Sequence, residues 1–139
     1  MKTVLTDENY DALAAYRWDR ALETLSEIPY LREQGYYNTA VNRLYYACYY
    51  AAVALLVQNR ILAGTHLGVK TMIGMHFVSK GLITRESGRA FTNLYESRQR
   101  GDYDEFVYAT KEEVDDLLPR ARKFVDEVGF LLSKGRILK

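Results

Sequence analysis

The stretch LYYACYYAAVALLV, from Leu44 to Val57, decides the fold of this chain. It carries no charge, and its apolar and aromatic side chains lie on every side of a helix. A helix that is apolar all round is buried all round, so we predict a central helix from about Tyr36 to Asn59. The apolar run is shorter than the ~20 residues that span a bilayer, which favours a core helix over a membrane span. Some of its tyrosine hydroxyls must meet polar partners or open onto a cleft.

Composition limits the class of protein. The chain has 139 residues, which predicts a single domain over residues 1–139. One cysteine excludes a disulfide framework, and the two histidines lack metal-ligand spacing, so we expect neither a metal nor a cofactor. The net charge of +1 means that any nucleic-acid binding must come from a local site. No targeting pattern precedes Glu8, and we expect a cytoplasmic location.

Helical spacing of apolar residues predicts further helices on both sides of the central one. Their expected ranges are about 7–28, 69–81, 85–101 and 111–133. Pro29 should stop the first helix, and Pro119 should kink or split the last one. Residues 134–139 are expected to fray. The predicted fold is therefore all-α, an up-and-down bundle of about five helices.

Arg98 is the most informative polar residue. It shares the inward stripe of its helix with Phe91 and Leu94, and a charge placed there must be paired or face a polar cleft. One interpretation is a structural ion pair with Asp102, four residues further on. The other is a guanidinium that binds phosphate through its planar fork. Spacing alone favours the structural pair.

A second polar position interrupts the central helix near its start. Asn42 and Arg43 share neighbouring faces with Tyr46, and this combination suits a stacked base and a phosphate. The alternative is a buried hydrogen-bond network, which is commoner in proteins. His66 precedes the third helix, where it can accept a hydrogen bond or lie beside an anion. His76 is expected in the core.

Three stretches together resemble the HEPN domains, named for nucleotide binding in higher eukaryotes and prokaryotes. They are Gly35–Leu56, Thr65–Ile83 and Leu94–Asp104. The resemblance is to the small stand-alone prokaryotic branch and extends from about Asp11 to Val128. Its most specific part is N-R-x-Y-Y-A at Asn42–Ala47 followed by R-x-x-G-D-Y at Arg98–Tyr103.

This resemblance implies a helical bundle, commonly dimeric, with a site in a cleft between protomers. Many such proteins are metal-independent ribonucleases, often toxins paired with a small nucleotidyltransferase antitoxin. Their signature is an arginine followed after four to six residues by a histidine. Arg98 matches the arginine, but Tyr103, Asp104 and Glu105 occupy the histidine positions. A tyrosine with a pKa near ~10 is a poor proton carrier at neutral pH, and Asp102 as a base would depart from the family chemistry. Asn42 matches a polar residue that the family directs at the same cleft.

Three functions stay open. The favoured one is a protein that binds nucleotide or RNA phosphate through Arg98 and Arg43, as half of a toxin–antitoxin-like pair with a nucleotidyltransferase. The second is a ribonuclease that uses Arg98 with Tyr103 or Asp102, although the missing histidine counts against it. The third is a non-catalytic dimerisation or interaction module. We also expect a homodimer, because the central helix carries more apolar surface than a monomer of this size covers.

Overall fold

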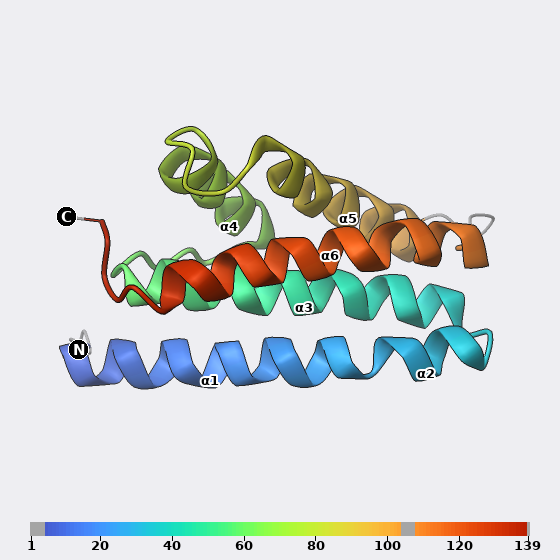
Figure 1. Cartoon of the computed structure of the whole chain (residues 1–139), viewed down its shortest axis with the longest axis horizontal. Coiled ribbons are helices and arrows are strands. Elements are labelled where there is room, and N and C mark those ends of the chain that lie inside the picture. Colours follow the sequence, from blue (N-terminus) through green and yellow to red (C-terminus); the bar gives the residue numbers. More distant parts are fainter. Residues whose placement is uncertain (1–4, 104–107, 139) are drawn as a thin grey trace.

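The computed structural model describes residues 5–103 and 108–138, without the side chains of residues 101–103. Its elements are α1 (Asp7–Ser26), α2 (Ile28–Glu33), α3 (Tyr37–Gln58), α4 (His66–Ile73), the π-helix η1 (Gly74–Val78), α5 (Arg85–Tyr103) and α6 (Lys111–Leu132). No strand occurs in the described ranges. The long helices α1, α3, α5 and α6 alternate in direction (Figure 1). The all-α, up-and-down prediction is confirmed.

The central position belongs to α3, as predicted. It packs against α1, α6, α5 and α4, and Leu44, Cys48 and Leu55 are fully buried along it. By length and composition α3 resembles a membrane span, but 67% of its most apolar window is buried inside the protein. That burial is what a core helix shows, so no membrane is indicated.

The two prolines occupy different kinds of position. α1 ends at Ser26, and Pro29 lies in the first turn of α2, where a missing N–H costs nothing. α2 continues almost along the line of α1 (Figure 1). Pro119 lies inside α6, which is not split. Pro119 has no N–H to donate to the backbone carbonyl of Asp115, one turn earlier. Asp115 is exposed, so water can donate to that carbonyl instead.

Two boundaries near α4 also differ from expectation. Thr65 caps the helix by accepting a hydrogen bond from the Gly68 N–H at 2.9 Å, so α4 begins at His66 rather than near Val69. The helix then widens into η1, whose longer turn changes the register of the side chains. His76 is therefore half-buried and does not lie in the core.

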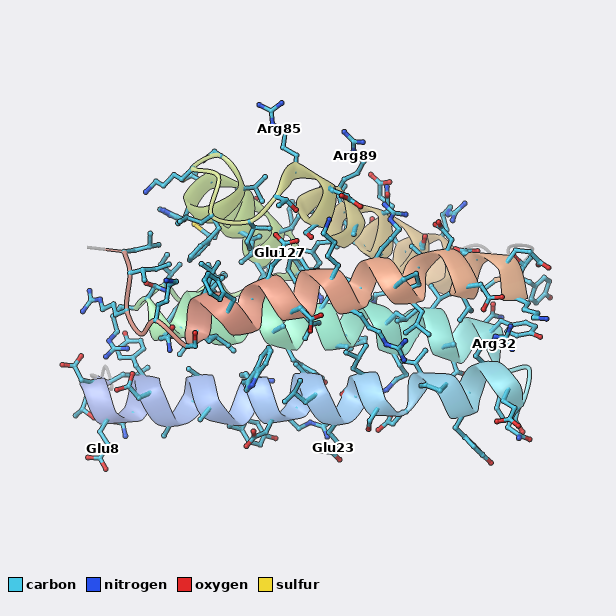
Figure 2. The ribbon with its side chains drawn as sticks, in the orientation of Figure 1. Glu8, Glu23, Arg32, Arg85, Arg89 and Glu127 are labelled. Atoms are coloured by element: carbon cyan, nitrogen blue, oxygen red, sulfur yellow. The ribbon has the colours of Figure 1, made fainter. Side chains whose placement is uncertain are left out.

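Contacts with α6 and with the end of α3 fix the remaining elements. Glu127 of α6 accepts hydrogen bonds from the N–H and Oγ1 of Thr84, at 2.8 and 3.0 Å, and so holds the start of α5 (Figure 2). Two residues of the C-terminal segment, which the sequence predicts to fray, are attached to the end of α3. The backbone N–H groups of Ile137 and Leu138 donate to Oδ1 of the buried Asn59, at 2.9 and 2.8 Å. This amide oxygen needs donors, which explains why the tail is fixed.

Candidate functional site

Arg98 lies where the sequence analysis predicts, on the inward face of α5. Phe91 and Leu94 on that face are buried, and Arg98 is half-buried. Its Cζ atom lies 5.4 Å from the ring centroid of Tyr45 and 5.4 Å from that of Tyr46. A guanidinium at this distance is attracted by the aromatic rings. Arg98 is thus held against α3 at the edge of the core.

The second member of the site is His66, which comes from the start of α4. Its Nδ1 atom lies 2.7 Å from the hydroxyl of Tyr45, a residue that is fully buried. Burial raises the pKa of Tyr45, so its phenol remains protonated at neutral pH. Because Nδ1 is engaged with the phenol, Nε2 is the ring nitrogen left for an outside partner.

Stacking and charge further define the imidazole. The His66 ring stacks on Tyr49 with centroids 4.4 Å apart and planes 13° apart. Burial, and to a smaller extent the positive charge of Arg98, lower the pKa of His66 below its ordinary 6.5. His66 is therefore neutral near pH 7. We call Arg98, His66, Tyr45, Tyr46 and Tyr49 the Arg98–His66 cluster.

The loop after α3 places His66 over that helix. Arg60 in this loop has a φ of 65°, a left-handed conformation that costs a non-glycine residue about 1 kcal/mol. Its guanidinium compensates by donating to Asp7 and Asp11 on α1, each at 3.1 Å, and to the Gln58 carbonyl at 2.9 Å. The loop is thereby tied to α1, which fixes where α4 begins.

The predicted site residues fall into three groups. Tyr46 contacts Arg98, and Asn42 lies one turn before Tyr46, half-buried on the same helix. Arg43 instead forms an ion pair with Glu27 at 3.2 Å, at the junction of α1 and α2. Asp102 and Tyr103 belong to α5 by their backbone, but their side chains lie outside the described residues.

Sequence reasoning missed the contact between His66 and Tyr45. The two residues are 21 positions apart in the chain, and no periodic pattern connects them. The available signal was the position of His66 beside a helix cap, which did not reveal its partner. Among the described residues, no three His, Cys, Asp or Glu side chains gather where they could hold a metal ion.

This arrangement combines a cation, a neutral imidazole and partly exposed aromatic rings. A guanidinium binds phosphate or carboxylate oxygens through two N–H groups. Tyr46 and Tyr49 are half-buried, so one part of each ring can meet a ligand. Aromatic rings of this kind stack nucleobases without requiring a particular sequence.

Comparison with known proteins identifies the family of this chain. The HEPN domain model matches residues 14–131. The chain belongs to the HEPN domain family. A UPF0332 protein of Thermotoga maritima is 34% identical over 114 residues, 82% of this chain and 86% of that protein. Two Methanocaldococcus jannaschii proteins bear the name "Putative toxin". One is 37% identical, covering 78% of this chain and 80% of its own length. The other is 30% identical, and the match covers 87% of this chain and 82% of that protein.

The lowered pKa of His66 predicts a pH-dependent stability. Below about pH 6.5 His66 binds a proton in the unfolded chain but not yet in the folded one, because its pKa is lower in the folded state. The free energy of unfolding therefore falls as the pH falls from about 6.5 toward the folded-state pKa of His66. We expect His66→Gln to lose less stability than the wild type between about pH 7.5 and 5, measured by urea unfolding. An equal loss in both proteins would show that His66 does not contribute.

Proposed function

We propose that this HEPN protein binds a phosphate group of a nucleotide or of RNA at the Arg98–His66 cluster. The observation that carries the proposal is the half-buried guanidinium of Arg98, held over Tyr45 and Tyr46 beside a neutral imidazole. Partial burial strengthens a charge-assisted hydrogen bond to an anion, because water competes less well there.

The aromatic rings favour a nucleotide over a simple anion. Tyr46 and Tyr49 lie within one turn of each other on α3, with ring centroids 6.1 Å apart. Stacking of one base on an aromatic side chain contributes roughly 1–3 kcal/mol. Asn42, half-buried on the same helix, is positioned to hydrogen-bond a ligand that lies over Tyr46.

The proposed partners follow from the family and its named members. Two relatives named as toxins support a role as the toxin-like half of a pair, in which a small nucleotidyltransferase is the partner.

We further propose a cytoplasmic homodimer, because the half-buried tyrosine face of α3 is available to a second copy. Light scattering at micromolar concentration should give the mass of two chains, and a monomer mass would contradict the dimer.

Replacing Arg98 tests the phosphate site. We expect Arg98→Ala to weaken the binding of uridine monophosphate by about 10- to 100-fold in calorimetry, the usual loss for a charge-assisted hydrogen bond. The matched control is Arg89→Ala on the same helix, because Arg89 is exposed and points away from the bundle (Figure 2). Arg89→Ala should bind as the wild type does.

A purely structural role for Arg98 has a different signature. In that case the wild-type protein binds no nucleotide, and Arg98→Ala lowers the free energy of unfolding by about 3–5 kcal/mol, as breaking a buried pair does. Under the binding proposal the loss of stability is smaller than this. Urea unfolding of the two variants separates the alternatives.

A metal-independent ribonuclease is the second candidate function. The observation that favours it is His66, which brings to Arg98 an imidazole that the chain after Arg98 lacks. In the tautomer whose Nδ1–H donates to the Tyr45 oxygen, Nε2 would accept the proton of the RNA 2′-hydroxyl as that oxygen attacks the phosphorus. The bond from phosphorus to the 5′-oxygen would break, the protonated imidazole would return the proton to the leaving 5′-oxygen, and Arg98 would stabilise the charge on the phosphate.

The ribonuclease candidate requires cleavage of RNA in the presence of a chelator. We expect any such activity to disappear in Arg98→Ala and His66→Gln and to persist in Tyr103→Phe. If Tyr103→Phe abolishes cleavage and His66→Gln retains it, the acid–base residue is Tyr103 and not His66. If the wild type leaves RNA intact under these conditions, the ribonuclease candidate is excluded and the binding function is unaffected.

A further inference from the structure

A small, partly open pocket lies beside the Arg98–His66 cluster, between α1, α3, the loop before α4 and the start of α4. Its volume is about 170 Å³. Leu13 and Arg17 of α1, Tyr49 and Val53 of α3, Ala63 of the loop and Val69 of α4 contribute to its wall. The wall is mostly apolar, and Arg17 supplies its one charged side chain.

Arg17 has an unmet hydrogen-bonding need at this pocket. Its Nε atom is buried and has no hydrogen-bond partner among the described residues. The guanidinium lies 5.9 Å from the ring centroid of Tyr16 and 5.8 Å from that of Tyr50, and neither ring offers Nε a hydrogen-bond acceptor oxygen in its plane. A buried donor without an acceptor destabilises the protein, because it has given up its hydrogen bonds to water. A ligand that brings an acceptor into the pocket removes this destabilisation.

The size and walls of the pocket select the chemistry of that ligand. An apolar cavity of about 150 Å³ accommodates one benzene ring. A pocket of about 170 Å³ therefore fits one six-membered ring better than the two fused rings of a purine. Arg17 only donates hydrogen bonds, so the ring must carry an acceptor such as a carbonyl oxygen. A pyrimidine base meets both conditions.

Tyr49 connects the pocket to the proposed phosphate site. It contributes to the pocket wall and also stacks on His66, which bonds to Tyr45 beneath Arg98. We propose that this pocket binds the pyrimidine base of a nucleotide whose phosphate lies at Arg98, with a ring carbonyl accepting a hydrogen bond from Arg17. This inference rests on the proposed function and adds a base preference to it.

The test compares two nucleotides on the full chain. Calorimetry should show that uridine monophosphate binds at least about tenfold more tightly than adenosine monophosphate. Arg17→Met keeps the apolar stem and removes the donor, and Ala63→Leu fills the pocket. Each variant should bring the affinity for uridine monophosphate down to that for adenosine monophosphate. The control is Arg20→Met on the same helix, because Arg20 pairs with Glu23 at 3.2 Å and should not affect the preference.

A spectroscopic reading shows whether the base enters the pocket. The ¹⁵Nε–¹H resonance of Arg17 should shift when uridine monophosphate is added and stay in place with inorganic phosphate. Equal binding of both nucleotides, with each still dependent on Arg98, would overturn the pyrimidine pocket and leave the phosphate site standing. An Arg17 resonance that stays in place while uridine monophosphate binds would also overturn the pyrimidine pocket and leave the phosphate site standing. If neither nucleotide binds, the proposed function fails, and the base preference fails with it.

Discussion

The burial of α3 is the constraint on which the rest of this structure depends. A helix that is apolar on nearly every side cannot fold unless other helices cover it, and α1, α6 and the α4–α5 pair do so. The remaining face of α3 carries Asn42, Tyr46, Tyr49 and Val53, which are half-buried. The aromatic rings of the proposed binding site lie along this face, because the covering helices leave these side chains partly exposed.

Electrostatics at the edge of this core follow from the same packing. Arg98 and His66 come from different helices and meet only because both pack on Tyr45. Two cations beside one another would repel, and the partial burial of His66 further disfavours its charged form. The cluster therefore holds one permanent positive charge and one neutral imidazole at neutral pH. The negative charge of an anion bound at Arg98 would attract a proton to His66 and so favour its protonated form. Ligand binding and the titration of His66 are therefore physically coupled.

Much of this could be predicted from local patterns, and the remainder depends on contacts distant in the chain. The all-α class, the bounds of α3 and the inward position of Arg98 follow from apolar periodicity, which reports local burial. The roles of Pro29 and Pro119 could not be read that way, because they depend on whether a helix restarts and whether water reaches a carbonyl. The partners of His66 and Arg43, Tyr45 and Glu27, are likewise set by how helices pack together. No motif marks Arg17 in the sequence, because its significance depends on a pocket that α1, α3, α4 and the loop before α4 form together.

If Arg98 and His66 act on the same anion, the pKa of the His66 imidazole must respond both to Arg98 and to a bound anion, and NMR measures this pKa. We expect a value below 6.5 in the wild type, a higher value in Arg98→Ala, and a rise on adding inorganic phosphate that occurs only when Arg98 is present. A His66 pKa that neither the substitution nor phosphate changes would contradict the account, because it would mean that the two side chains do not sense a common charge.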